Sequence, residues 1–383
     1  MQIEAVKQSD LERIKATLDI NEELANQRDE SGAASPITRR AFMAAIGGAG
    51  ISALCSARHG AAALKGQGAV APANRRRCVD VHHHILPPEY VRLVGRDAIG
   101  RPSPLRSVPH WDVSKSLSAI DENAVQAAVV SISAPGILLN DGGLAKRLAR
   151  SCNEFASQMS ADHPKRFGFF AALPLPDVEA SLTELGHAIE RLNCDGVGLM
   201  TNYGDRYLGD PLFKPLFDEL NRRRAIVYVH PTTCSCDLDV LPGVPSSAIE
   251  FPHSTTRTVV SLLFSDTFTQ CPNIRFIFSH AGGTIPFLAD RISMIARVYG
   301  KSAQLTALKR LYYDTALSAN AASFSALTKL VTSKQILFGS DFPFAPNGVK
   351  ATFDGLRGLG LSDPELQDIE WGNASVLFPR LTQ

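Results

Sequence analysis

The chain has 383 residues, of which 45% are hydrophobic and 20% are charged, so it can bury a sizeable core in one large domain or two medium ones. Its 39 lysines and arginines nearly balance its 38 aspartates and glutamates, which excludes the strongly basic surface of a typical nucleic-acid-binding domain and leaves small molecules as the expected partners. The seven cysteines form no C-x-x-C pair, and we expect them to be mostly reduced and buried.

The first predicted element is an export signal. Residues 38–54 read TRRAFMAAIGGAGISAL, in which Arg39 and Arg40 precede an uncharged run rich in alanine and glycine, as in a twin-arginine signal. The run is too short and too weakly hydrophobic for a stable membrane span. We expect cleavage between about residues 57 and 63, a signal region over residues 1–63, and export to the periplasm by the twin-arginine machinery. The alternative is an N-terminal helix with a charged edge on a cytoplasmic protein.

Beyond residue 77, short runs of β-branched and aromatic residues alternate with longer stretches of helical period. Such alternation indicates β–α units around a parallel sheet. Eight strands are predicted, over residues 78–84, 127–133, 166–174, 195–200, 225–231, 274–281, 311–316 and 336–341.

The segments between these strands have the periodicity of helices. The predicted helices cover residues 114–124, 142–164, 178–193, 211–224, 255–271, 285–300 and 321–332, with a last helix over 362–379. Eight parallel strands with interleaved helices in roughly 300 residues predict a (β/α)8 TIM barrel. We expect this barrel to form a single catalytic domain over residues 74–383.

The ends of four predicted strands carry residues that bind metals. In a TIM barrel the chemistry lies at the carboxyl ends of the strands. The first strand ends in three histidines, and the fifth, sixth and eighth end in His230, His280 and Asp341. So many histidines with an aspartate on one rim indicate a functional site rather than core residues.

Alternation along the first strand separates its three histidines. We expect His82 and His84 to face the barrel mouth and His83 to pack outward under the first helix. Imidazoles with one carboxylate suit Zn²⁺ best, with Mn²⁺ and Fe²⁺ as alternatives. Four residues are therefore predicted as metal ligands: His82, His84, His230 and Asp341. His280 is predicted to stand beside the metal, where it can hold a water molecule or pass a proton.

Five stretches around these residues carry a resemblance to a known family: DVHHHILPPEY (80–90), VYVHP (227–231), FSHAGGTIPFLADRI (278–292), FGSDFPF (338–344) and GNASVLFP (372–379). The set resembles the amidohydrolase superfamily. Within it, the chain is similar to the metal-dependent carboxy-lyases related to α-amino-β-carboxymuconate-ε-semialdehyde decarboxylase, γ-resorcylate decarboxylase and 6-methylsalicylate decarboxylase.

The resemblance implies the same four metal ligands and makes His280 the family's catalytic histidine. The fourth strand ends in LMTNYG (199–204), which offers neither a lysine to be carbamylated nor a glutamate to bridge two ions. This departure from the binuclear hydrolases favours one metal ion. The resemblance also implies a homo-oligomer, as a dimer or larger.

The activity implied by the resemblance is the metal-dependent, non-oxidative decarboxylation of a small aromatic or unsaturated carboxylic acid, such as a hydroxybenzoate. The metal would orient the substrate while an acid, either His280 or Asp341, protonates the carbon that loses CO₂. The alternative on the same scaffold is a hydrolase of a lactone or amide, in which His280 activates water. A non-catalytic binding protein is disfavoured, because pure binding needs no spare base.

Loops after the strands offer candidate substrate contacts. A carboxylate substrate calls for a cation, for which Arg206 and Arg106 are candidates. Aromatic walls suit an aromatic acid, and Phe342 and Tyr203 are the predicted aromatic contacts with the substrate. Further aromatic residues of these loops are Phe344, Phe251, Tyr207, Phe287 and Trp111. Asp314, which ends the seventh strand, is expected either to orient a ligand or His280, or to make only a buried hydrogen bond.

Overall fold

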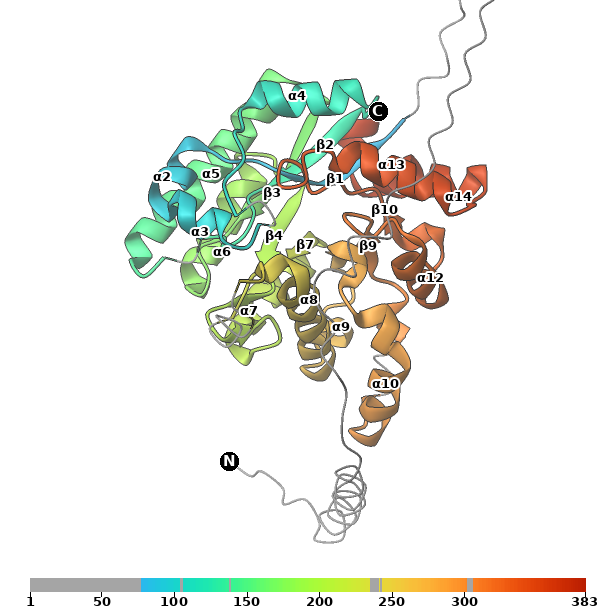
Figure 1. Cartoon of the computed structure of the whole chain (residues 1–383). Coiled ribbons are helices and arrows are strands. Elements are labelled where there is room, and N and C mark those ends of the chain that lie inside the picture. The colour runs from blue at the N-terminus through green and yellow to red at the C-terminus, as the bar shows by residue number, and fades with distance from the viewer. Residues whose placement is uncertain (1–76, 104–105, 138, 235–240, 242, 302–305) are drawn as a thin grey trace, which may run out of the picture. The chain divides into compact units, whose positions relative to one another are not determined.

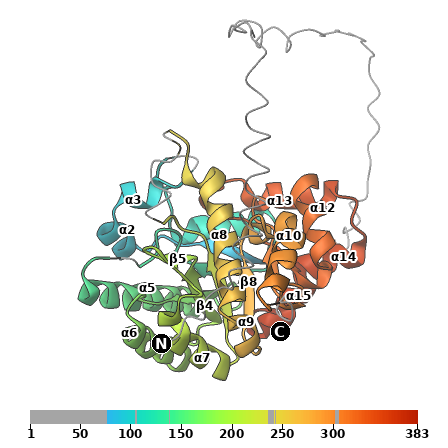
Figure 2. The ribbon, with the colours of Figure 1, turned by 90° about the horizontal axis from the view of Figure 1, so that it is seen from below.

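Eight parallel strands, in the order β1-β2-β3-β4-β7-β8-β9-β10, form the centre of the domain, and helices lie outside them (Figures 1 and 2). The computed structural model describes residues 77–383 except 104–105, 138, 235–240, 242 and 302–305. These residues belong to the second of the two units into which the chain divides, Ala71–Gln383. The predicted export signal in residues 1–63 lies outside the described residues.

Each strand lies within a segment that the sequence predicts. The strands are β1 (Val79–His84), β2 (Ala127–Ser131), β3 (Phe167–Ala172), β4 (Gly196–Met200), β7 (Ile226–His230), β8 (Arg275–Phe278), β9 (Tyr312–Asp314) and β10 (Ile336–Leu337). Backbone hydrogen bonds between β1 and the segment that directly follows β10 complete the ring: the N–H of Val81 donates to the carbonyl of Phe338, and the N–H of Asp341 donates to that of His82, both at 2.9 Å. The TIM-barrel prediction is therefore confirmed.

Helices cover the barrel between successive strands. The main ones are α4 (Val113–Glu122), α5 (Gly142–Asp162), α6 (Val178–Glu190), α7 (Lys214–Arg222), α8 (Ser246–Phe264), α10 (Ile285–Val298), α12 (Ala321–Leu330) and α13 (Gly348–Gly358). Shorter elements are α2 (Pro88–Val94) and α3 (Arg96–Gly100) after β1, a hairpin of β5 (Asn202–Tyr203) and β6 (Arg206–Tyr207), α9 (Thr267–Gln270), and the C-terminal α14 (Asp363–Gln367), α15 (Asn373–Leu377) and α16 (Pro379–Thr382). Helices α2, α3 and α13 were not predicted, and α8 begins well before residue 255.

The missed helix α13 is rich in glycine, the residue that least favours helices apart from proline. Its packing explains the composition. A Cβ atom on Gly348 would lie 2.0 Å from the carbonyl oxygen of Ser340, and one on Gly355 would lie 2.1 Å from that of Ala319. Only glycine lets the helix approach these loops so closely, so tertiary packing outweighs local propensity here.

Two apolar layers hold the barrel together. The larger core lies between strands and helices, where side chains such as Val130 and Phe169 pack with Ile120 of α4. The second cluster joins side chains of β1 and β7, such as Val81 and Tyr228, to the C-terminal Phe378, Leu377 and Leu381. Burial of these side chains from water is the main force that holds the strand ends, and hence the site, in place.

Two further features are the state of the cysteines and the character of the helices. Cys78, Cys152, Cys194 and Cys271 carry reduced thiols, as expected, and Cys234, which is disulfide-bonded, is an exception to the mostly reduced state. Among the described residues, no helix combines the length and the apolar character that a membrane crossing requires.

Candidate metal centre

The site begins with the three histidines of β1, which face two different sides. His83 packs outward, where its Nε2 lies 2.9 Å from Oγ of Ser116 on α4 and its ring stacks on Phe342 with centroids 4.7 Å apart. His82 and His84 turn the other way, and their Nε2 atoms lie 3.1 Å from each other. The separation of the pair from His83 is the one that strand alternation predicts.

An irregularity in β1 lets two neighbouring residues face inward. The pairing of β1 with β2 shifts register between Asp80 and His83. The N–H of His82 donates to the side chain of Asp80, at 3.1 Å from its Oδ1. Val81 therefore joins the apolar cluster of the barrel while the next residue, His82, joins the site. β-Bulges near active sites re-aim side chains in this way.

Four predicted ligands meet at the barrel mouth. Oδ1 of Asp341 lies 3.3 Å from Nε2 of His82 and 3.2 Å from Nε2 of His84. With His230 at the end of β7, one donor atom from each of the four residues falls within 4.8 Å of all the others. Three imidazoles and a carboxylate from three strand ends are thus gathered around one point.

This geometry fits a single divalent ion. Donor atoms about 2.1 Å from one ion lie roughly 3.0 Å apart in octahedral and about 3.4 Å apart in tetrahedral coordination. The separations of 3.1 to 3.3 Å between the donor atoms of His82, His84 and Asp341 match that range. In addition, Nδ1 of His230 is buried without a hydrogen-bond partner in the described part of the chain. A buried imidazole nitrogen that lacks a hydrogen-bond partner gains one when it binds a cation.

Asp314, at the end of β9, orients the predicted ligand His82 through the ring nitrogen that faces away from the other ligands. Its Oδ2 lies 2.9 Å from Nδ1 of His82, so this nitrogen donates to the carboxylate and Nε2 is left to bind. Its Oδ1 accepts the backbone N–H of His280 at 2.9 Å and that of Ala316 at 3.0 Å. Of the two roles expected for Asp314, orientation of a ligand is the one that these contacts support.

The electrostatics of the cluster follow from burial and two carboxylates. Burial lowers the pKa of His82, but Asp314 and Asp341 outweigh it and raise that pKa to about 10. Burial lowers the pKa of His84 and, together with the neighbouring histidines, holds the pKa of His230 well below its usual value. Burial raises the pKa of Asp341, yet the surrounding imidazoles hold it well below its usual range. The cluster therefore offers an ionised carboxylate and two neutral imidazoles for metal binding, with one proton to displace.

Asp341 and His280 both adopt a left-handed backbone conformation, with φ of 61° and 52°. Such angles are unfavourable for residues other than glycine and persist only where the surroundings impose them. Hydrogen bonds do so here, because the N–H of Asp341 donates to the carbonyl of His82 and the N–H of His280 donates to Asp314. Strain at these two positions points to function.

His280 stands beside the cluster. Its Nε2 lies 3.8 Å from Oδ2 of Asp341, and its ring meets that of His82 edge to face with centroids 4.8 Å apart. Its Nδ1 is buried without a hydrogen-bond partner among the described residues. His280 is thus within reach of a molecule held at the cluster, where it can pass a proton.

A cavity of about 530 Å³ opens onto the cluster, and His230, His280 and Asp341 line it. Phe251 of α8 and Phe344 of the loop after β10 form apolar walls. The ring centroid of Phe251 lies 6.0 Å from that of His230, and the centroid of Phe344 lies 5.7 Å from that of His84. The size suits a small substrate.

None of the four predicted substrate contacts lines this cavity. Arg206 is exposed and pairs with Asp210, with Nη1 2.9 Å from Oδ2. Arg106 is exposed, and its guanidinium donates to the carbonyl of Gly243. Tyr203 is buried, with its hydroxyl accepting the N–H of Met200 at 3.1 Å, and Phe342 stacks on His83 instead.

Other lining residues were missed, for different reasons. Phe251 and Phe344 were among the loop aromatics but were not named as contacts. Leu317 and Ser318 also line the cavity and are the third and fourth residues after β9, so the strand-end rule could have found them. Ile99 belongs to α3, a short helix without a strong sequence signal.

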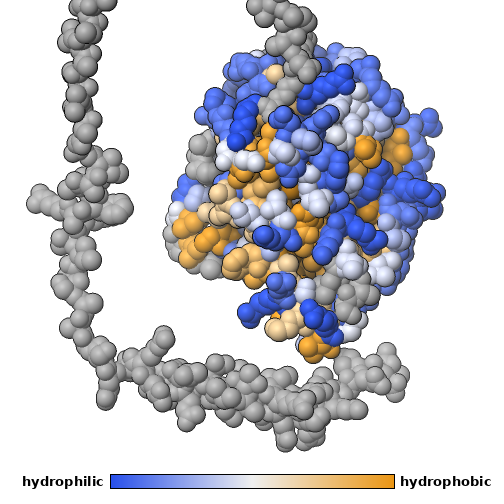
Figure 3. Space-filling view, turned by 90° about the vertical axis from the view of Figure 1, so that its right-hand side faces the viewer, coloured by the Kyte–Doolittle hydropathy of each residue, from blue (hydrophilic) through white to orange (hydrophobic). Residues whose placement is uncertain are grey.

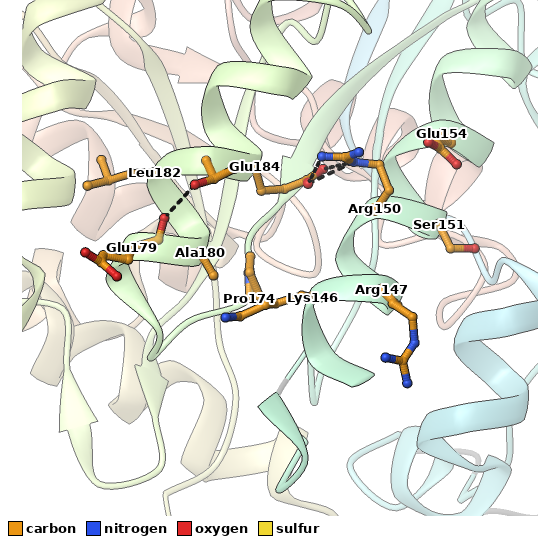
Figure 4. A pocket seen from close by; sticks show the side chains of 11 residues that line it. Lys146, Arg147, Arg150, Ser151, Glu154, Pro174, Glu179, Ala180, Leu182 and Glu184 are labelled. Atoms are coloured by element: carbon orange, nitrogen blue, oxygen red, sulfur yellow. Dashed lines mark hydrogen bonds and ion pairs between the residues drawn. The ribbon is translucent and has the colours of Figure 1, made fainter. Parts of the chain in front are cut away.

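A second groove, of about 900 Å³, lies between α5 and α6 (Figure 4). Two of its cations are paired: Arg150 binds Glu184 with Nη2 to Oε2 at 2.8 Å, and Lys146 binds Asp177, outside the lining, at 2.8 Å. It contains no histidine or cysteine among its described lining residues. This groove therefore has the character of a solvated surface, and the catalytic candidates lie in the smaller cavity.

Comparison with known proteins agrees with this geometry. Residues 79–380 match the amidohydrolase family. A decarboxylase from Aspergillus niger is 37% identical over 323 residues, which cover 79% of this chain and 87% of the relative. A 6-methylsalicylic acid decarboxylase from Penicillium expansum is 36% identical over 314 residues, which cover 79% and 96%.

Solved structures give the same fold. A crystal structure described as an amidohydrolase II superposes with a TM-score of 0.72 at 27% identity and covers 80% of this chain and 100% of its own. A manganese-bound dihydroxybenzoic acid decarboxylase from Polaromonas sp. has a TM-score of 0.67 at 21% identity, over 81% and 98%, and shows likeness of fold. From its family match and these relatives, the chain belongs to the amidohydrolase family.

Proposed function

We propose that this chain is a metal-dependent, non-oxidative decarboxylase of a small aromatic or unsaturated carboxylic acid. The observation that carries the proposal is its identity of 37% and 36%, over 79% of the chain, to fungal relatives that are named decarboxylases. The complete set of four metal-binding side chains beside His280 supports it, because such chemistry needs both a metal site and a proton donor.

His82, His84, His230 and Asp341 would hold one divalent ion. Three nitrogen donors and one oxygen donor favour Zn²⁺ by ligand chemistry. Mn²⁺ is the alternative, since a solved decarboxylase of the same fold is described with manganese. When bound, such an ion supplies an electrophilic anchor that orients a carboxylate or hydroxyl oxygen of the substrate.

The proton donor is His280. Loss of CO₂ breaks the bond between the carboxyl carbon and the ring carbon, and the electron pair left on the ring carbon must take a proton. Nε2 of His280 is near the cluster and lines the cavity. Asp341, the other candidate acid, is in contact with three imidazoles, which keep it as a carboxylate suited to ligation. Phe251 and Phe344, both nearly buried, help to keep water from the reacting carbon.

One assay tests this proposal. The protein, loaded separately with Zn²⁺ and Mn²⁺, is incubated with a panel of hydroxybenzoates while CO₂ release is measured, in parallel with lactone and amide substrates. We expect CO₂ from at least one acid and no turnover of lactones or amides. Turnover of a lactone or amide without CO₂ from any acid would instead establish a hydrolase.

We also infer that the chain forms a homo-oligomer with a second copy of itself. Helix α10 supports this inference, because it carries exposed apolar side chains at Phe287, Met294 and Val298, spaced to share one helix face. The side of the molecule that bears α10 shows hydrophobic patches among hydrophilic residues (Figure 3). Light scattering after size exclusion should give at least a dimer mass, and Phe287→Glu combined with Val298→Glu should reduce it. A monomeric wild-type protein would overturn the inference.

Export by the twin-arginine route is a further proposal, which rests on the sequence of residues 38–54 alone. Replacing Arg39 and Arg40 together by lysine should strand the protein in the cytoplasm, as cell fractionation would show. Unchanged recovery from the periplasm would contradict the proposal.

A further inference from the structure

The cavity beside the metal centre has an unusual charge content for a protein proposed to act on anions. Asp341 is the one residue with a formal charge among its described lining residues, and none of them is a lysine or arginine. Its remaining polar lining consists of hydroxyls, such as those of Ser133 and Ser318, and of the imidazoles of the site. Any positive charge in the cavity would therefore belong to the metal centre or to the proton donor His280 beside it.

Within residues 77–383, this absence does not depend on the short stretches that the structure leaves undescribed. Between residues 77 and 383 those stretches read PL, L, SCDLDV, P and SAQL, and they contain no lysine or arginine. The exposed Arg106 does not line the cavity, and its guanidinium donates to the carbonyl of Gly243.

The apolar walls of the cavity also disfavour a second negative charge on the substrate. Phe251 and Phe344 come from different elements, and each meets a histidine of the metal cluster edge to face. They therefore border the metal cluster at two different histidines, where a flat ring anchored at the metal can lie against apolar surface. A carboxylate on the far part of such a ring would lose its hydration without gaining a cation, which is strongly unfavourable.

We propose that the site selects aromatic monocarboxylic acids whose other ring substituents are apolar or uncharged, and rejects acids with a second carboxylate. Phe251 and Phe344 are the residues that hold the ring. The inference rests on the proposed decarboxylase function and deepens it, because it confines anion binding in the cavity to the metal centre and the adjacent His280.

The test compares salicylates that differ at a single ring position. The substituent is a methyl group, a nitro group or a carboxylate; the nitro group matches the carboxylate in size and shape but has no net charge. We expect kcat/KM for the methyl and nitro compounds to agree within about tenfold, and that for the carboxylate compound to be lower by at least about 100-fold. A carboxylate compound within tenfold of its nitro partner would overturn the inference.

This test separates the inference from the proposed function. If no compound of the series released CO₂, the proposed function would fail, and calorimetric binding of the same compounds to the metal-loaded protein would decide the inference. Binding of the carboxylate compound as tight as that of the nitro compound would overturn it. Binding weaker by at least about tenfold would support it.

A gain-of-function substitution provides a second test of the inference. Ala248 is exposed, lines the cavity and precedes Phe251 by three residues on α8, so its side chain lies on the same helix face. Ala248→Arg should raise kcat/KM for the carboxylate compound at least about tenfold, whereas the uncharged Ala248→Gln should not. Equal values for the two variants would show that charge is not what excludes the second carboxylate, and would overturn the inference.

Discussion

The opposite roles of two adjacent histidines give the sharpest prediction. His82→Ala should weaken metal binding strongly, because His82 contributes one of four donors to the cluster. His83→Ala should leave metal affinity within a few fold of the wild type but lower the free energy of unfolding. The two changes remove the same side chain from neighbouring positions, so each serves as the matched control for the other.

The expected magnitudes follow from the contacts. Apparent binding free energies of roughly 10–16 kcal/mol for four-ligand zinc sites correspond to about 2.5–4 kcal/mol for each ligand, or a loss of about 10²- to 10³-fold in affinity. His83 contacts the buried Asp80 and Ser116 and stacks on Phe342. Its removal leaves a buried carboxylate and a hydroxyl with fewer partners and opens a cavity, at a cost of about 3 kcal/mol.

Competition with a chelating dye measures the metal affinity of each variant, and urea denaturation of the metal-free proteins measures stability. Wild-type metal affinity in His82→Ala would refute the ligand assignment. Loss of metal affinity in His83→Ala comparable to that in His82→Ala would refute the division of β1 into an inward pair and an outward histidine.

Three further outcomes can be stated from the structure. His280→Ala should retain metal but lose at least about 10²-fold in the rate of CO₂ release, since it removes a proton donor. Metal analysis and initial rates check this. An unchanged rate would show that His280 takes no part in the reaction. Because the pKa of His82 is raised to about 10, this residue is protonated near neutral pH, so metal binding should release about one proton and should tighten about tenfold per pH unit between roughly pH 7 and pH 9. Titration calorimetry in two buffers measures the number of protons released on metal binding. Asp314→Asn removes the carboxylate that contributes most to the raised pKa of His82, so the number of protons released should fall toward zero. An unchanged number would contradict the pairing of His82 with Asp314. Gly355→Ala should destabilise the fold by about 2 kcal/mol, because a Cβ atom there would lie 2.1 Å from a backbone carbonyl oxygen. The control Gly358→Ala, which has open space around it, should be neutral or stabilise by about 0.5 kcal/mol. Opposite results in urea denaturation would contradict the packing of α13.

Strand ends were the most predictable part of the molecule. Hydrophobic runs and turn residues located all eight strands, and the carboxyl-end rule then brought His82, His230 and Asp341 to one rim without any knowledge of their distances. The register shift in β1 was beyond prediction, because it depends on the contact of Asp80 with the backbone of His82 and with Ser340 from the far end of the chain.

The substrate pocket was much less predictable. Arg206 and Arg106 have the right charge for an anionic substrate, but each has a local partner at the surface, and sequence does not show which way a loop side chain turns. Phe251 lies on the early part of α8, which follows Pro245 and was not expected to be helical. Loop conformation depends on long-range contacts that short-range patterns do not encode.

The central claim is that the chain removes CO₂ from an aromatic acid by protonating the carbon that carried it. The most direct test is to run the metal-loaded enzyme with its best hydroxybenzoate in D₂O and to analyse gas and product together. The account predicts one CO₂ per product molecule, one deuterium on the vacated ring carbon and no consumption of O₂. A product without deuterium at that carbon, or one whose formation consumes O₂, would contradict it.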